Sequence, residues 1–425
     1  MLEPAPAALM QCRQQFEASG YTANPDLRPA HLDTAGLQAM NAGLNRLSDD
    51  IRDHETNQYI QAAYTARIDE LIFGNSMALA AAAGDHAGFL RANKLLYGTP
   101  QPELFAAAVA WVRGNAQATA TAGSAGLAKL QAAVLKALPD ISGGNPQRLM
   151  PSEATFRAVR RLHLAPGGYR DQLFGLQKLP QQPYIDQNEG DEICRRVIAN
   201  IGSDYGIAES QDGIWAVLNS AKQVIRPAGY RLDLDEFSGI VCHEIGSHLL
   251  ESANGSRQPL RLLGIGLASF ESGNEGRAFL REQIVYNSEA EFTHQSSWEY
   301  ILLLYLGVCL ASGSYGRPYS FAKLYAVLFA LHGFWRERRY PMATNNQLSA
   351  REESWQLAVR IMKGTSGSPD MPGCYMKDIV YLEGNIACWD IAANDPAMIL
   401  RGDLGKFNIA SPQHLRILRG LGILQ

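Results

Sequence analysis

The sequence predicts an α+β fold that is mostly α-helical and carries only a small β-sheet. Three observations support this fold class. Apolar residues recur at three- and four-residue spacings up to about Leu138, strand-like alternation is nearly absent there, and a clear β-hairpin pattern first appears at Gly213. Because 46% of the 425 residues are hydrophobic, the chain can bury one large core or two modest ones.

The N-terminal region is expected to be a helical scaffold. Helical periodicity covers Asn57–Phe73, Met77–Ala83 and Phe89–Leu96, and Ala and Leu dominate Phe105–Leu138, where intrinsic propensity favours a helix. Clustered Gly and Pro between residues 139 and 183 then break regular structure. We therefore predict a helical region over residues 1–180, with a Gly/Pro-rich connection, and a second domain over residues 181–425.

The second half mixes helices with a few strands. A helix over Asp191–Gly202 precedes a β-hairpin over Gly213–Arg226, whose turn falls at Asn219-Ser220. Asp233 or Asp235 then begins a helix, because acidic residues suit a first helical turn. Further along, Ile301–Ala311 reads as a buried helix too short to span a bilayer, and Ile379–Leu382 (IVYL) is strand-like.

Charge and termini exclude several classes of partner. Charged residues make up 19% and the net charge is −4, so no footprint for nucleic acid or for an anionic membrane is visible. No signal peptide or transmembrane segment is apparent, so a cytoplasmic protein is expected, with non-classical export left open. The six scattered cysteines favour reduced thiols, and Cys242 is expected to be a buried core residue rather than a metal ligand.

The segment that carries chemistry is Val241–His248, which reads VCHEIGSH. A hydrolytic zinc site needs three protein ligands and one open position for water, and imidazole is a preferred donor. It also needs a carboxylate that takes the proton of the water without binding the metal. His243 and His248 fit the first need and Glu244 fits the second. The alternative is a helix with two polar histidines that bind nothing.

The two histidines are five residues apart, whereas the usual spacing is four. On an ideal helix five residues correspond to about 140° and four to about 40°. One extra residue in the turn, a π-bulge, would return both rings to one face. Gly246 lies in this turn and makes such a distortion easier because it has no side chain. The spacing therefore predicts a π-bulge.

A third ligand should come from a later carboxylate. The downstream candidates are Glu251, Glu271, Glu275, Glu282 and Glu289. Glu251 lies on the motif helix itself, so its side chain cannot easily turn back toward a metal held by the two histidines. Glu271 and Glu275 are one turn apart and share a face, so spacing leaves these two tied.

At this point the sequence resembles a known family. HEIGSHLLESANG followed by NEGRA is similar to the HEIGTH…NG…QEGLA arrangement of the microtubule-associated tyrosine carboxypeptidases and their bacterial relatives. Residues 89–100 (FLRANKLLYGTP), 219–226 and 375–384 (YMKDIVYLEG) resemble further segments of that family, in the same order, so the likeness covers roughly residues 40 to 400.

The resemblance implies a gluzincin-like zinc metallopeptidase with an HExxxH motif, whose zincin-like catalytic domain spans residues 181–425. It implies one Zn²⁺ per chain held by His243, His248 and Glu275, with Glu244 as general base. The implied reaction removes the C-terminal residue of a peptide or protein, an aromatic one in the eukaryotic members. Ser247, Asn274 and Arg277 depart from the family pattern, and Arg277 is expected to reach solvent or to line the cleft.

A carboxypeptidase also needs a cation that binds the free carboxylate of its substrate. The candidates are Arg360, Lys363, Lys377 and Lys222. Tyr381, with His294 as the weaker choice, is a candidate donor to the oxyanion. The predicted hairpin offers an edge strand for an extended substrate. An endopeptidase or aminopeptidase on the same core, or a zinc-containing binding protein without activity, stays open, as does the physiological substrate.

Overall fold

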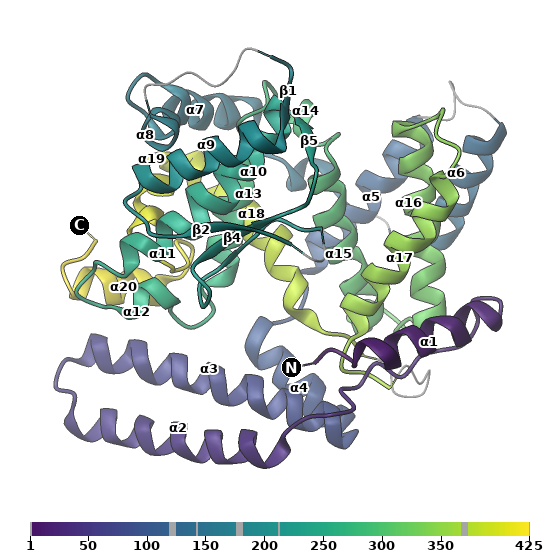
Figure 1. Cartoon of the computed structure of the whole chain (residues 1–425). Helices are drawn as coiled ribbons and strands as arrows, with labels where there is room; N and C mark the ends of the chain where they lie inside the picture. The colour runs from purple at the N-terminus through teal and green to yellow at the C-terminus, as the bar shows by residue number, and fades with distance from the viewer. Residues whose placement is uncertain are drawn as a thin grey trace. The chain divides into compact units, whose positions relative to one another are not determined.

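The chain folds into two compact units, each assembled from separate stretches of sequence (Figure 1). The computed structural model describes residues 2–118, 125–141, 143–175, 182–210, 213–366 and 373–424. Unit 1 comprises Met1–Leu47, Asp69–Leu149 and Glu299–Ile379. Unit 2 comprises Ser48–Ile68, Met150–Trp298 and Val380–Gln425. Neither unit is a continuous segment such as 1–180 or 181–425.

Among the residues described, the regular elements of unit 1 are all helices. Its helices are α1 Pro6–Ala18, α4 His86–Tyr97, α5 Pro102–Ala118, α6 Ala125–Ala137, α16 Phe321–Arg339 and α17 Asn346–Met362, with short 3-10 turns η2 Pro146–Leu149 and η4 Met376–Asp378. Helices that run from one unit into the other are α2 Thr34–His54, α3 Gln58–Ala83, α15 Ser296–Ser312 and α18 Ile379–Asn394.

The predicted N-terminal helices are confirmed, except that two of the predicted segments form a single helix. Helix α3 covers both Asn57–Phe73 and Met77–Ala83 almost entirely and ends before Gly84, whose φ of +70° suits a glycine. Asp85 caps α4 by accepting a hydrogen bond from the Gly88 amide. Helices α5 and α6 cover most of the Ala/Leu-rich stretch 105–138. Leu138 follows the end of α6, and residues 119–124 lie outside the described residues.

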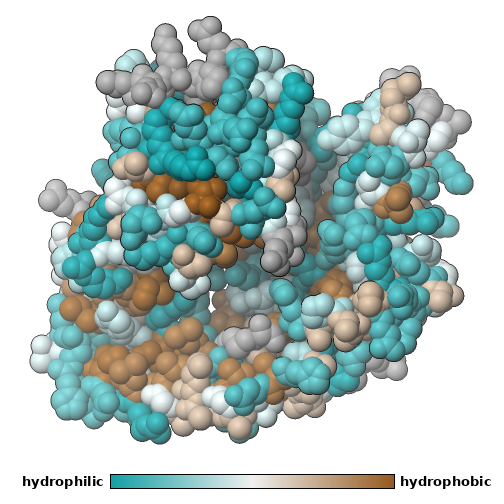
Figure 2. All heavy atoms as spheres, viewed as in Figure 1, coloured by the Kyte–Doolittle hydropathy of each residue, from teal (hydrophilic) through white to brown (hydrophobic). Residues whose placement is uncertain are grey.

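Unit 1 contains a fully buried apolar helical segment and several exposed apolar side chains. The predicted buried helix over residues 301–311 is confirmed, because every residue of that stretch except Gly307 belongs to the buried hydrophobic core of α15 and Gly307 is itself buried. On the face shown in Figure 2, apolar side chains gather over α2 and α3, where Met40, Leu47 and Leu71 are exposed. Among the described residues, no helix has both the length and the hydropathy needed to cross a membrane.

The strands of unit 2 form two small sheets. β1 Tyr184–Asp186 pairs antiparallel with β5 Arg231–Asp233. In the second sheet the order is β2-β4-β3, with β2 Gly206–Glu209 parallel to β4 Gln223–Arg226 and β3 Ala216–Leu218 antiparallel to β4. The predicted hairpin is thus confirmed, and β3 is an edge strand of its sheet.

Unit 2 also contains helices, and several of them contact the motif segment. Its helices are α7 Glu153–Leu164, α8 Tyr169–Phe174, α9 Gln187–Asn200, α10 Leu234–His243, α11 Leu250–Gly255, α12 Leu262–Ile265, α13 Glu271–Gln283, α14 Glu289–Phe292, α19 Ala397–Arg401 and α20 Pro412–Gly420, with a 3-10 turn η5 Gly402–Leu404. Among them, α9, α11 and α13 contact the motif segment. The predicted helix starting near Asp233 is α10, and Asp233 is its N-cap, accepting from the Glu236 amide. Phe237, Val241 and Ile245 are buried in the core of this unit, which fixes the rotation of the motif helix.

The expectation of a strand at residues 379–382 is wrong. This segment begins α18, whose apolar residues surround the helix on all sides. A short apolar run of this kind cannot be assigned to strand or helix by periodicity, and here the length of the buried segment decides for a helix. Helix α18 also crosses α13 closely enough that the crossing requires glycine, because a Cβ on Gly384 would overlap the carbonyl oxygen of Ser272.

Candidate metal centre

The two motif histidines lie at either end of a widened helical turn. Helix α10 ends at His243, and residues Glu244–Leu249 continue as a π-helix, η3. The rings of His243 and His248 are 5.0 Å apart between centroids, at an interplanar angle of 74°. The prediction of a π-bulge from the five-residue spacing is confirmed. The reason suggested for Gly246 is incomplete, because a Cβ there would also overlap the Tyr169 hydroxyl.

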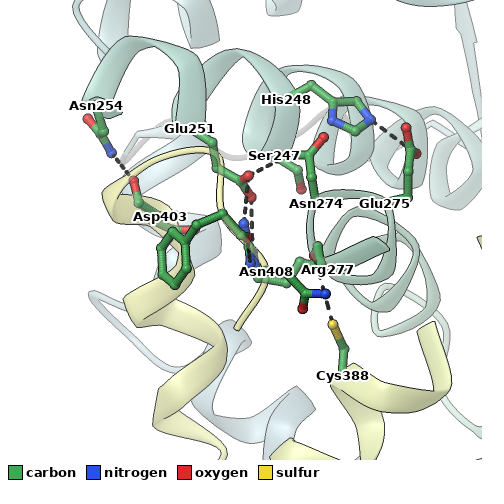
Figure 3. A network of polar contacts seen from close by, with 12 residues as sticks. Ser247, His248, Glu251, Asn254, Asn274, Glu275, Arg277, Cys388, Asp403 and Asn408 are labelled. Carbon is green, nitrogen blue, oxygen red and sulfur yellow. Dashed lines mark hydrogen bonds and ion pairs between the residues drawn. The ribbon is translucent and has the colours of Figure 1, made fainter. Parts of the chain in front are cut away.

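Helix α13 brings Glu275 to the two histidines. One Glu275 carboxylate oxygen, Oε2, is 3.8 Å from His243 Nε2 and 3.5 Å from His248 Nε2, and Figure 3 shows the His248 and Glu275 side chains pointing toward each other. One potential ligand atom from each of the three residues lies within 4.8 Å of the others. Their side chains are only 13% (His243), 14% (His248) and 19% (Glu275) exposed. Two imidazoles and one carboxylate so arranged could hold a metal ion.

Glu282 orients the first histidine. Its Oε2 lies 3.0 Å from His243 Nδ1, which places the ring's other nitrogen, Nε2, on the side of Glu275. A carboxylate on the far nitrogen is how metal-binding histidines are commonly fixed in one tautomer. From the sequence, Glu282 was only one candidate for the third ligand, and this orienting role was not predicted. The available signal was its position seven residues after Glu275, two turns along the same face of α13.

The electrostatics of the cluster favour a cation. Glu244 Oε1 is 4.0 Å from His243 Nε2, beside the three clustered residues rather than among them. Burial lowers the pKa of His243, but the hydrogen bond to Glu282 and the charges of Glu244 and Glu275 outweigh it and raise that pKa to about 9. A positive charge is therefore stabilised at this position. Glu271, tied with Glu275 by spacing alone, is not a member of the cluster found among the described residues.

Behind the site lies an ionic network in which Glu251, Arg277 and Arg281 are fully buried and Asp403 is partly buried. Arg277 donates to both carboxylate oxygens of Glu251, at 3.1 and 2.7 Å (Figure 3). Asn274 donates to the same carboxylate. The expectation that Arg277 reaches solvent or lines the cleft is wrong, because its side chain is fully buried and pairs with Glu251. The position of Glu251 on the motif helix was clear from the sequence, but its pairing with Arg277 was not predicted.

Tyr381 is linked to His243 through one intervening ring. Its ring meets that of Phe279 edge-on at 5.9 Å, and Phe279 meets His243 edge-on at 4.7 Å between centroids. Cys242 is buried, as expected of a core residue. His294 is exposed, with Nδ1 2.6 Å from the Ala290 carbonyl oxygen. The donor role predicted for Tyr381 stays a prediction.

The four candidate cations have distinct local surroundings. Arg360 forms a bidentate ion pair with the buried Asp378 in unit 1, at 2.9 and 2.8 Å. Lys363, also in unit 1, is 3.3 Å from Glu3. Lys222 lies in the exposed turn of the hairpin and pairs with Asp204 at 2.7 Å. Lys377 belongs to the η4 turn of unit 1. Their role in binding a substrate carboxylate stays a prediction.

Fold and site together define a mostly helical protein with a histidine–glutamate cluster suited to a metal ion. Residues 177–292 match the family model described as MATCAP, microtubule-associated tyrosine carboxypeptidase, which supports the family resemblance of this segment. The matched segment contains the hairpin, the motif and Glu275. The likeness at residues 89–100 and 375–384 lies outside it and stays a prediction. No curated protein matches the chain.

Proposed function

We propose that this protein is a zinc-dependent metallocarboxypeptidase that hydrolyses the C-terminal peptide bond of a peptide or protein. The observation that carries the proposal is that His243 and His248, at either end of the widened turn, meet Glu275 of α13, inside the segment that matches a carboxypeptidase family. The donor set suits zinc, since nitrogen from two imidazoles and oxygen from one carboxylate leave a position for water or substrate. When bound, zinc would polarise the scissile carbonyl and activate the water.

The residues of the chain would supply the proton transfers and the orientation. Glu244 lies beside the three proposed ligands without belonging to the cluster, which suits a general base that takes the proton of the attacking water and returns it to the leaving amine. Glu282 would keep His243 in the tautomer whose Nε2 faces the metal. Tyr381 is the proposed donor to the oxyanion.

The substrate would bind in an extended conformation. Strand β3 pairs only with β4 among the strands described, and it lies next to the π-helix that carries His248. A peptide added along the open edge of β3 would run past the metal-binding residues. The family description makes an aromatic C-terminal residue the first preference to test. A cation from the set Arg360, Lys363, Lys377 and Lys222 would bind the free carboxylate.

Mass spectrometry of a C-terminally varied peptide library, incubated with zinc-loaded protein, tests the proposal. Loss of single C-terminal residues is expected, and the same peptides with a C-terminal amide should resist. Cleavage of amidated peptides would instead indicate an endopeptidase or aminopeptidase. The matched control is Glu244→Gln at equal zinc content. Equal rates for this variant and the wild type would contradict the enzymatic role and leave a zinc-binding protein.

A further inference from the structure

The widened turn that carries His248 is held by two side-chain hydrogen bonds, one from within the turn and one from another helix. A π-turn departs from the regular i→i+4 pairing of an α-helix and is rare. Buried carbonyl groups in such a turn still need hydrogen-bond donors. Ser247 Oγ donates to the Cys242 carbonyl oxygen at 2.9 Å, and Arg281 Nη1 donates to the Gly246 carbonyl oxygen at 2.8 Å.

Arg281 is the central contact of this arrangement. Its side chain is fully buried, and the same Nη1 lies 3.3 Å from Ser247 Oγ. Its other terminal nitrogen, Nη2, pairs with Asp403 from η5. The guanidinium also stacks over the Tyr169 ring, 4.4 Å from its centroid. One arginine thus ties the turn to η5 and to α8.

The same helix supplies the arginine and the proposed third ligand. Arg281 and Glu275 both belong to α13, so the helix that brings a carboxylate to the histidines also fixes the backbone between them. In a regular α-helix, residues five apart diverge by about 140°. If the turn relaxed to that form, His248 would leave the face shared with His243.

We propose that Arg281, anchored by Asp403, is a positioning residue that keeps the turn at Glu244–Leu249 in its π form and so holds His248 beside His243 and Glu275. The inference rests on the metal site of the proposed function and assigns Arg281 no contact with substrate. Arg281 acts on the metal only through the backbone of the turn. Its loss should therefore weaken metal binding without removing a ligand.

Arg277 provides a matched control. It lies one turn earlier on α13, is equally buried and pairs with Glu251, yet it has no hydrogen bond to residues 243–248 among those described. Replacing either arginine by methionine removes one buried charge from the same network. The two variants should lose similar folding stability, whereas only Arg281→Met should disturb the turn.

Two measurements separate positioning from general destabilisation. Zinc dissociation constants, measured by competition with a chelator, should rise about 10- to 100-fold in Arg281→Met and stay within about 3-fold in Arg277→Met, as for other residues that orient metal ligands. The absorption spectrum of the Co²⁺-substituted protein should change only in Arg281→Met. Arg281→Lys should recover part of the affinity, because it keeps a charged donor. Equal changes in both methionine variants, or none in Arg281→Met, would overturn the proposal.

A third measurement needs neither zinc nor activity. Amide hydrogen exchange over residues 244–249 of the metal-free protein should accelerate in Arg281→Met more than in Arg277→Met. If Arg281→Met does not fold, Asp403→Asn keeps the arginine and removes its charged anchor, with a smaller expected loss of zinc affinity of about 3- to 10-fold. An unchanged affinity and exchange rate in that variant would count against the proposal. Failure of the wild type to bind zinc would refute the proposed function, whereas the exchange measurement would still decide the role of Arg281.

Discussion

Gly276 and Gly384 face each other where α13 crosses α18, with no room for a side chain on either. A Cβ on Gly276 would lie 2.2 Å from the carbonyl oxygen of Gly384. Because Gly276 directly follows Glu275, this close helix crossing fixes the position of the Glu275 carboxylate relative to the two histidines. The glycine of NEGRA is therefore explained by helix packing rather than by flexibility.

Gly384→Ala should force α13 and α18 apart. Overpacking of this kind costs about 1–3 kcal/mol, and the displaced Glu275 should weaken zinc binding as well. Urea unfolding and a zinc titration measure both effects. Gly114→Ala in α5 is the control, because its Cβ would meet no atom within 4 Å and alanine is the better helix former. If Gly384→Ala changes neither the unfolding free energy nor the zinc affinity, the crossing of α13 and α18 can accommodate a methyl group.

Glu282→Gln should weaken zinc binding about 10- to 100-fold while leaving all three proposed ligands in place. The amide is a weaker partner than a carboxylate for His243 Nδ1, which Glu282 now holds at 3.0 Å. Chelator competition gives the dissociation constant. Glu289→Gln is the matched control, since Glu289 is another downstream glutamate, in α14, and no hydrogen bond joins it to His243 among the described residues. Similar affinities for the two variants would argue against orientation by Glu282.

Stability should fall at acidic pH in part because of His163. This histidine is fully buried in α7, and burial, followed by the positive charge of Arg281, lowers its pKa from 6.5 to about 4. The unfolded chain binds the proton first, so this contribution is complete above pH 6.5 and is lost as the pH falls toward 4. The loss amounts to at most about 3 kcal/mol.

The comparison that isolates this effect is wild type against His163→Asn, by urea unfolding between pH 7.5 and 4.5. The wild type should lose more unfolding free energy over this range than the variant does. Parallel curves for the two proteins would mean that the His163 proton affinity is the same in the folded and unfolded states.

Removal of zinc should lower the midpoint of thermal unfolding. A ligand at 100 times its dissociation constant stabilises the folded state by about 2.7 kcal/mol. Addition of a chelator should therefore lower the midpoint, and excess zinc should restore it. In His248→Ala the midpoint should not respond to zinc, because one imidazole of the cluster is gone. A zinc response of normal size in this variant would place the ion elsewhere.

The sequence was sufficient wherever a local pattern determined the structure. The N-terminal helices, the hairpin at residues 216–226 and the π-turn all follow from periodicity or spacing within a few residues. The short strands β1, β2 and β5 were not foreseen, because three or four residues leave too little pattern. The segment at residues 379–382 was assigned wrongly because its conformation depends on burial against α13, which lies far away in the sequence.

In the site, too, some features follow from the local sequence and others depend on residues far away in the chain. His243 and His248 could be paired by spacing, whereas the choice of Glu275 over Glu271 required the family resemblance. The burial of Arg277 could not be anticipated, since an isolated arginine near the end of a motif usually reaches solvent. Its partner Glu251 lies 26 residues earlier, and only the packing of α13 against the motif helix brings the two together.

The interleaving of the units has a consequence for biosynthesis. During translation, residues 243–275 leave the ribosome together, but Asp403 and Gly384 emerge only after the whole stretch Glu299–Ile379 of unit 1 has been made. A nascent chain thus carries the three clustered side chains long before it carries the residues that clamp them. Completion of the centre is therefore a late event, one that waits for the final stretch of polypeptide to dock.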